Sequence, residues 1–418
     1  MDVIDDMSLP SVIPTESSPL PLPVSDLTID IIHAEILSKL PPKSLMRFKT
    51  VCKYFDAIIS SPEFIRLHLR HSLSSNSRLL VTNGSDHTIN MYDLNSHSSA
   101  PSVTFRWPTY TTSVVGSCNG LLLLKINYDI GRLLPLALVN PFTRTYIEFQ
   151  TTDPDIVKGY IGFGFDECSN DYKVVVVSGM NKSYSDYRVT TVYSVNLKSW
   201  KVVDRAFTSD FMEEPYTRYN GVLVNDNLLH WIIVKRSDRK RRIGCFDIIS
   251  ETWQEDVLFP DHYYDPTRKG NFLDFGVLDG CLFTSFVNQI ELFFDVWVMK
   301  EYGVHESWTK LLSINIGADL NGGVVPIANP FDESMIRKSK RGFTKAIAIP
   351  GGVIPVACRG IDQTEVLFRK RYDSYTLFWY NWKNNSISKP EIPNVYGHQP
   401  YFVKESLVRF PNAKQFDA

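Results

Sequence analysis

The stretch of residues 27–69 has the apolar spacing of several short helices. Ile29, Ile32, Ile36 and Leu40 recur at intervals of three or four residues, which places them on one face of a first helix. Further helices are expected behind it, and four helices in about forty residues can bury only a small common core. The stretch therefore has more apolar surface than its helices can cover among themselves, and something else must cover the rest.

Prolines and capping residues divide this stretch into its helices. Pro41 and Pro42 end the first helix, because proline lacks the amide that the next turn needs. A second helix is expected over residues 45–51 and a third over residues 54–59. Residues 61–63, Ser-Pro-Glu, open a fourth helix with a cap, a proline at the first helical position and an acid in the first turn.

Beyond residue 77 the chain alternates short strand patterns with turns, and the alternation is periodic. Trp200, Trp253 and Trp308 lie 53 and 55 residues apart, and each opens a strand that follows another strand and a turn. Units of this length with several strands are typical of a β-propeller built from four-stranded blades. At this spacing, residues 78–412 give an all-β propeller of about six to seven blades. The repeated tryptophans are expected to pack one blade against the next.

Turn residues recur within these units and predict hairpins. Asn119-Gly120, Asn170-Asp171, Asp226-Asn227 and Asp279-Gly280 each stand directly before a strand. Asparagine, aspartate and glycine tolerate the positive backbone angles that tight hairpin turns need.

Composition changes this picture by exclusion. The chain has 44 basic and 46 acidic residues, so it carries no overall field that would gather nucleic acid or an anionic membrane. Its six cysteines lie far apart with no Cys-x-x-Cys pair, which indicates a reducing compartment. The first residues are acidic where a secretory signal is basic, and no apolar run is long enough to cross a membrane. Residues 1–23 are rich in proline and serine and are expected to be a flexible leader.

Candidate catalytic chemistry is weak throughout. No histidines have the spacing of metal ligands, and no Gly-x-Ser-x-Gly motif is present. Gly162-Phe163-Gly164 is better explained by close approach of strands than by a phosphate loop, since no Gly-Lys-Ser follows. His230 lies inside a strand pattern and is expected to be a core histidine. No catalytic residue, cofactor or metal is predicted, and the chain is not expected to be an enzyme.

Basic runs are the more informative candidates. The first run, residues 235–242, lies between two strand patterns. Residues 337–341 and 369–371 are similar runs that are also expected between strands. Each is either a solvated hairpin end or a part of a surface for an acidic partner, and the first also resembles a nuclear-import signal. The candidate substrate-facing loop consists of Lys235, Arg236, Arg239, Lys240, Arg241 and Arg242.

The helical stretch resembles the F-box of plant proteins over its whole length. The matching positions are Leu27, 30–32, 35–37, 40–41, 43–45, 47–49, 51–53, 58–59, 61–62, 64–65 and 68–69. The resemblance implies that the helices dock on the Skp adaptor of a cullin-RING ubiquitin ligase. Where the family has Leu-Pro this chain has Leu27-Thr28, and where the family has tryptophan it has Phe55. The implied docking set is Leu27, Ile31, Ile36, Leu37, Leu40, Pro41, Leu45, Val51, Cys52 and Phe55.

The strand-rich region resembles the kelch-like, F-box-associated propeller domain of the same plant proteins. Its matching words include SCNGLLLL, LVNPFTR, GFGFDECSNDYKVVVV, VYSVNLKSWK, GVLVNDNLLHW, FDIISETW, GVLDGCL and DVWVMKEYGVHESWTKL, which cover most of the span of residues 117–312. The expected organisation is a disordered leader at 1–23, an F-box at 24–70, a linker at 71–77 and the propeller at 78–412.

Together the two resemblances imply a substrate-recognition subunit of a Skp-cullin-F-box (SCF) ubiquitin ligase, placed in the cytoplasm and nucleus. The F-box would bind the Skp adaptor, and the propeller would bind an unknown protein to be ubiquitinated; no nucleic acid or membrane is expected as a partner. Two alternatives stay open. One is a propeller scaffold that works without the ligase. The other is a small-ligand or glycan sensor with an aromatic pocket at the ring axis, to which Trp231, Tyr263, Tyr264 or Trp379 would contribute.

Overall fold

The structure of the chain is a computed structural model. It describes residues 32–72, 78–83, 88–93, 103–106, 112–126, 135–150, 159–179, 188–204, 211–212, 220–235, 237–238, 240–261, 270–288, 293–315, 353–359, 364–370, 377–384, 386–390 and 401–415.

Short helices open the described chain and form one small module, the helical module (residues 32–72). Its first helix is irregular: a π-turn, η1, is followed by a 3₁₀ turn, η2, and Pro41 and Pro42 prevent its continuation. The Ser61 hydroxyl accepts a hydrogen bond from the Phe64 amide at 3.2 Å and caps the last helix. The elements are η1 (Ile32–Ile36), η2 (Leu37–Lys39), α2 (Pro42–Phe48), α3 (Lys53–Ile59) and α4 (Pro62–Ser72).

The described strands form six antiparallel sheets, which are numbered I to VI along the chain. Sheet I holds β25 (Tyr401–Val403), β1 (Arg78–Asn83), β2 (Thr88–Asp93) and β3 (Val103–Arg106). Sheet II holds β4 (Thr112–Cys118), β5 (Leu121–Ile126), β6 (Pro135–Asn140), β7 (Thr145–Gln150) and β26 (Lys414–Gln415). Sheet III holds β8 (Tyr160–Asp166), β9 (Asp171–Gly179), β10 (Arg188–Ser194) and β11 (Ser199–Asp204).

The remaining sheets come from the second half of the chain. Sheet IV holds β12 (Phe211–Met212), β13 (Val222–Val224), β14 (Leu228–Lys235), β15 (Arg241–Asp247) and β16 (Thr252–Trp253). Sheet V holds β17 (Gly270–Leu278), β18 (Cys281–Asn288), β19 (Phe293–Met299) and β20 (Trp308–Asn315), with the 3₁₀ turn η6 (His305–Ser307) before its last strand. Sheet VI holds β21 (Val353–Arg359), β22 (Glu365–Lys370), β23 (Leu377–Asn381) and β24 (Ser386–Ser388).

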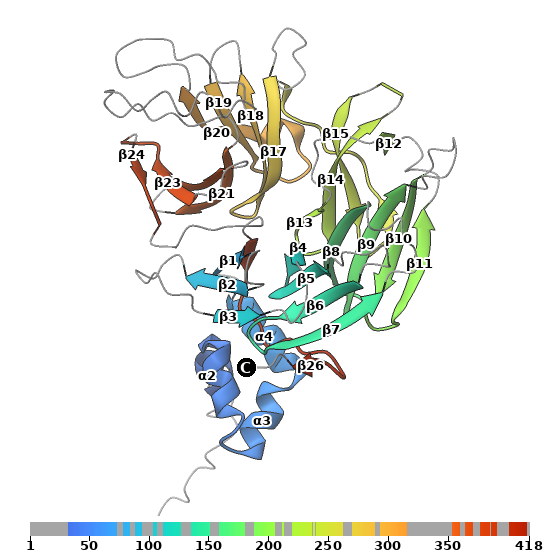
Figure 1. The fold of residues 1–418 in the computed structure, drawn as a ribbon, viewed down its shortest axis with the longest axis vertical. Helices are drawn as coiled ribbons and strands as arrows, with labels where there is room; N and C mark the ends of the chain where they lie inside the picture. The colour runs from blue at the N-terminus through green and yellow to red at the C-terminus, as the bar shows by residue number, and fades with distance from the viewer. Residues whose placement is uncertain are drawn as a thin grey trace, which may run out of the picture.

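The sheets are arranged around a common centre, as Figure 1 shows. One strand of each sheet lies toward that centre, and contacts run in succession from β25 to β4, β8, β13, β17 and β21. A helical module followed by a β-propeller is therefore confirmed. The predicted repeat of six to seven equivalent blades is not confirmed. Five sheets, II to VI, are each built around strands that are consecutive along the chain, whereas sheet I is completed by β25 from the C-terminal segment.

The repeated tryptophans pack each sheet against the one before it, as predicted. The indole Nε1 of Trp200 in sheet III donates to the Gln150 carbonyl of sheet II at 3.2 Å. Trp253 of sheet IV donates to the Thr190 hydroxyl of sheet III at 3.0 Å. The indole of Trp308 in sheet V donates to the carbonyl of residue 258, just after sheet IV, at 3.0 Å.

The turn residues adopt the backbone that the sequence predicts. Asn119, Asn170, Asp226 and Asp279 all have a positive φ between 50° and 61°. Gly120 has a φ of 75°, and a Cβ atom there would come within 2.3 Å of the Ser406 Cβ and 2.5 Å of the Lys404 carbonyl oxygen. Glycine at this turn therefore serves a second purpose, because it lets the end of the chain pass directly over it.

The C-terminal segment (residues 401–415) connects several parts of the molecule. After β25 pairs with β1, the segment crosses sheet II, where the Asn140 side-chain amide donates to the carbonyls of Ser406 and Val408 at 3.1 and 2.8 Å. Leu407 is buried in the core of the helical module, and Phe410 in the core shared by sheets II and III. Finally β26 pairs with the outer strand β7.

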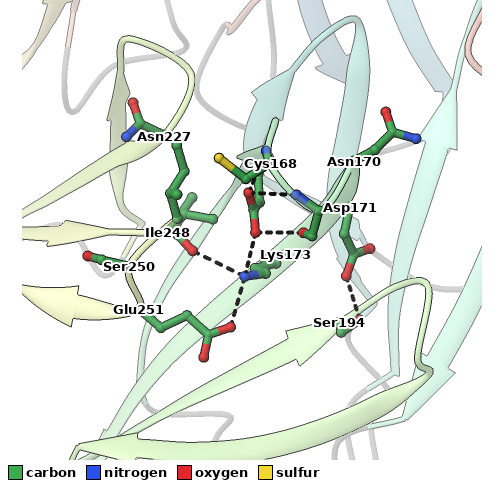
Figure 2. A network of polar contacts seen from close by, with 12 residues as sticks. Cys168, Asn170, Asp171, Lys173, Ser194, Asn227, Ile248, Ser250 and Glu251 are labelled. Carbon is green, nitrogen blue, oxygen red and sulfur yellow. Dashed lines mark hydrogen bonds and ion pairs between the residues drawn. The ribbon is translucent and has the colours of Figure 1, made fainter.

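A buried cluster of charges joins sheets III and IV (Figure 2). The Lys173 ammonium lies 2.8 Å from a carboxylate oxygen of Asp166 and 2.8 Å from one of Glu251, and it donates to the carbonyl of Ile248 at 3.2 Å. Burial alone would lower the pKa of Lys173, but the hydrogen bonds to both carboxylates outweigh it and raise the pKa. Lysine is therefore held in its charged form between the two sheets.

His230 of β14 is a core histidine, as expected from the sequence. Its side chain is fully buried, and its Nδ1 lies 3.2 Å from the Val222 carbonyl oxygen, which can only accept a hydrogen bond. In the neutral ring Nε2 is then the acceptor, and it receives the hydroxyl proton of Tyr302 at 2.6 Å. The hydroxyl of Tyr302 also lies 3.3 Å from Cys245 Sγ.

A pH dependence of stability follows from this burial. Desolvation lowers the pKa of His230 from 6.5 to about 4, so the unfolded chain binds the proton more readily. The contribution of neutral His230 to the free energy of unfolding is fully present above pH 6.5. We expect about 3 kcal/mol of it to be lost as the pH falls from 6.5 to about 4. Urea unfolding at a series of pH values across this range measures the free energy of unfolding. That free energy should fall less steeply with decreasing pH in His230→Gln than in the unaltered chain, and an equally steep fall would contradict the assignment.

Candidate adaptor-binding surface

The helical module presents an apolar surface to solvent. Ile36 is 53% exposed, Val51 67%, Tyr54 48% and Phe48 37%, although each is a large apolar or aromatic residue. The Phe48 and Phe55 rings meet edge to face with centroids 5.8 Å apart, and Tyr54 packs on Phe55 at 5.9 Å. Figure 1 shows α3, which carries Tyr54 and Phe55, at the end of the module away from the sheets.

The docking residues implied by the resemblance fall into different environments. Ile36, Pro41, Val51 and Cys52 are exposed, while Leu40 and Phe55 are half-buried at the edge of the core. Leu27 and Ile31 lie outside the described residues. The exposed members, together with Phe48 and Tyr54, define what is called below the adaptor face.

Two members of the implied set do not lie on the surface. Leu37 is 3% exposed and Leu45 is fully buried, and both pack inside the helical module with Ile59, Phe64 and Leu407. In this structure they stabilise the module and offer no area to a partner. The surplus apolar surface predicted from the sequence is thus covered in part by the chain's own C-terminal segment.

Phe48 and Tyr54 were not among the predicted docking residues, yet they are exposed beside Val51. Both rings contact Phe55, which the resemblance did place in the docking set, and their large apolar or aromatic character next to it was the available signal. The Tyr54 hydroxyl lies 3.3 Å from His33 Nε2, which connects this ring to the first helix.

The candidate substrate-facing loop is less basic than its sequence. Lys235 ends β14 and Arg241 and Arg242 begin β15, so only Lys240 of the described members lies between the strands; Arg236 and Arg239 lie outside the described residues. The Lys235 ammonium pairs with Asp256 at 2.6 Å, and the Arg242 guanidinium pairs with Asp238 and lies 4.0 Å from Asp256. Carboxylates from the same sheet therefore offset much of its charge.

Three other expectations are revised by burial. Arg369 was predicted in a loop, but it lies within β22, is 5% exposed and faces Asp274 at 3.5 Å. Trp231 and Trp379, candidates for an aromatic pocket, are 1% and 2% exposed inside the sheets. Tyr263 and Tyr264, like residues 337–341, lie outside the described residues.

The described part of the chain contains neither a metal-binding cluster nor a membrane-spanning helix. No group of three or more histidine, cysteine, aspartate or glutamate side chains is placed to hold a metal ion there. No helix among the described residues is long and apolar enough to cross a membrane.

Comparison with known protein families gives two matches that together cover most of the chain. Residues 24–67 match the F-box domain, and residues 67–341 match the F-box associated beta propeller domain. The order of the two matches is the order of the helical module and the sheets in the structure.

Several curated proteins of Arabidopsis thaliana are similar over most of their length. F-box protein CPR1 is 31% identical over 317 residues, which is 70% of this chain and 73% of that protein. F-box/kelch-repeat protein At3g23880 is 31% identical over 67% of this chain and 77% of its own length. F-box protein At4g22390 is 29% identical over 70% and 74%, respectively. The chain belongs to the plant F-box proteins that carry an F-box-associated β-propeller domain.

Proposed function

We propose that this chain is the substrate-recognition subunit of an SCF ubiquitin ligase. The helical module docks on the Skp adaptor and, through it, on the cullin, while the propeller holds the protein to be ubiquitinated. The chain makes no bond itself. Its contribution to rate is positional, because a substrate lysine held near the charged conjugating enzyme reacts as if within one molecule. Its expected location in the cytoplasm and nucleus stays a prediction.

The adaptor face is the observation that supports this proposal most directly. The helical module already has a closed core, which Leu407 completes from the C-terminal segment. Ile36, Phe48, Val51 and Tyr54 nevertheless remain exposed outside that core. Several large apolar side chains exposed on one small module mark a protein interface. The F-box match indicates the Skp adaptor as the partner.

Ile36→Glu combined with Val51→Glu is expected to weaken binding to the purified Skp adaptor by at least about 30-fold. Each change places an unpaired carboxylate in an apolar contact, at a cost of about 1–3 kcal/mol. Calorimetric titration of the full chain with the adaptor measures the effect. Both positions are exposed, so the melting temperature should change little.

Val202→Glu is the matched control, because Val202 is a 46% exposed valine on β11 of the propeller. It should leave adaptor binding as in the unaltered chain. If the double variant melted normally and still bound the adaptor with full affinity, the proposed docking would be wrong.

A further inference from the structure

A groove of about 920 Å³ separates the helical module from the propeller. The module supplies one wall from α2, α3 and α4, and the other wall comes from sheets II and III and from the C-terminal segment. Half-buried apolar side chains form its floor, among them Ile65, Leu69, Phe165 and Val408. A cavity of this size lies at the upper end of the range for small-ligand sites and has room for a short peptide segment.

The groove and the adaptor face lie on different sides of the helical module. Met46 and Lys49 line the groove, whereas Phe48 and Val51 belong to the adaptor face. Met46 and Phe48 are two positions apart on α2, so their side chains point in different directions from the helix. An occupant of the groove would therefore leave the adaptor face accessible.

The described lining of the groove carries more positive than negative charge. Lys49 is paired with Asp56 and Lys414 with Glu148, the only carboxylate among the described lining residues. Lys198 and Arg409 are exposed, and neither lies within 4.0 Å of a carboxylate in the part of the chain that the structure describes. The Arg409 guanidinium donates to Met46 Sδ at 3.3 Å and acts on the Asp56 carboxylate from a longer distance. Two cations from separate elements, the β10–β11 turn and the C-terminal segment, thus line the propeller wall of the groove.

Two asparagine amides on the same wall add hydrogen-bonding capacity. Asn170 and Asn412 have φ values of 51° and 60°, and among the described residues neither side-chain amide has a hydrogen-bond partner. Figure 2 shows the Asn170 amide directed away from the Lys173 cluster below it. An amide offers one acceptor and two donors, which matches the carbonyl and N–H groups of a peptide backbone.

We propose that this groove binds an acidic peptide segment with apolar side chains, contributed by the protein that the chain presents for ubiquitination. The inference rests on the proposed function and adds the chemistry of the substrate. Apolar side chains of the segment would cover the floor, its backbone would pair with Asn170 and Asn412, and its carboxylates would reach Lys198 and Arg409. Charge complementarity selects an acidic segment over a neutral or basic one.

Selection from a displayed library of random twelve-residue peptides tests the proposal on the full chain bound to the Skp adaptor. The expected peptides are enriched in aspartate and glutamate next to leucine or phenylalanine. Measured by fluorescence polarisation, their affinity should fall by at least about tenfold in Lys198→Glu combined with Arg409→Glu, and should also fall as salt is raised. Lys300→Glu combined with Lys389→Glu, which reverses two exposed charges away from the groove, is the control.

Each other outcome would overturn the inference. Peptides without an acidic bias, or acidic peptides that bind the Lys198 and Arg409 variant with full affinity, would place recognition elsewhere. Displacement of the peptides by inorganic phosphate at low concentration would assign the cations to a small anion. A rise of tenfold or more in affinity after deletion of residues 1–23, which are acidic and lack lysine and arginine, would make this chain's own leader the occupant.

The same variants separate this inference from the proposed function. The groove variant should bind the Skp adaptor with full affinity, because Lys198 and Arg409 are not on the adaptor face. Loss of peptide binding with adaptor binding retained supports the groove. Failure of the unaltered chain to bind the adaptor contradicts the ligase role, whatever the peptides show.

Discussion

Lys173→Met is expected to lower the free energy of unfolding by about 3–5 kcal/mol, because it leaves Asp166 buried without its counter-charge and leaves the partly buried Glu251 with only the exposed Lys201. Asp166 and Glu251 come from sheet III and from the turn after β15, and the Lys173 ammonium lies 2.8 Å from each. Methionine fills a similar volume but donates nothing to them. Equilibrium unfolding in urea at neutral pH measures the loss directly.

Lys201→Met is the matched control, since it removes a different cation from the same Glu251. The Lys201 ammonium lies 2.9 Å from Glu251, but its side chain is 71% exposed. A solvated pair of this kind contributes at most about 1 kcal/mol. Equal losses in the two variants would show that the buried cluster does not stabilise the junction between the sheets.

The same cluster adds to the acid sensitivity of the fold. Burial disfavours both charged carboxylates, yet hydrogen bonds outweigh it and lower both pKa values. They come from Lys173 and Ser169 at Asp166, and from Lys173 and Lys201 at Glu251. Their contribution is complete above the ordinary carboxyl pKa values of 3.8 and 4.5, and it is lost as the pH falls through the lowered ones.

Leu407→Asp is expected to unfold the helical module or detach it from the propeller, at a cost of more than about 4 kcal/mol. The variant removes a buried side chain from the cluster of Leu37, Leu45, Ile59 and Phe64 and puts an unpaired carboxylate there. Adaptor binding should be lost with it, although residue 407 is buried and is not part of the adaptor face. Circular dichroism and adaptor titration of the full chain report the two effects.

Leu407→Met is the control, because it changes the residue but keeps a buried apolar side chain of similar size. It keeps volume and apolarity, so it should cost less than about 1.5 kcal/mol and retain adaptor binding. An aspartate variant that melted like the unaltered chain would show that the C-terminal segment is not needed by the module.

Local chemistry explains what the sequence predicts well. Proline pairs end helices wherever they occur, so the limits near Pro41 and Pro42 follow from the residues alone. Asn119 and Asp279 were predicted at turns because asparagine and aspartate tolerate a positive φ, and both residues adopt one. The period of Trp200, Trp253 and Trp308 is visible because each repeats one contact with the preceding sheet.

What the sequence does not predict depends on pairs that are distant along the chain. Leu37 and Leu45 have the apolar character of docking residues, and only the arrival of Leu407 shows that they are interior. The charge of the basic run is partly offset by ion pairs with Asp256, which lies beyond the next strand along the chain. The prediction of six to seven equivalent blades was wrong for a similar reason. Spacing along the chain does not reveal that sheet I is completed by a strand from the C-terminal segment.

The C-terminal segment also constrains how the protein is made. Synthesis proceeds from the first residue to the last, and domains generally fold as soon as they have emerged. Here neither the helical module nor sheet I can be completed until residues 401–415 have left the ribosome, because Leu407 and β25 belong to them. A prematurely terminated product would lack both, so its helical module and its sheet I would stay incomplete.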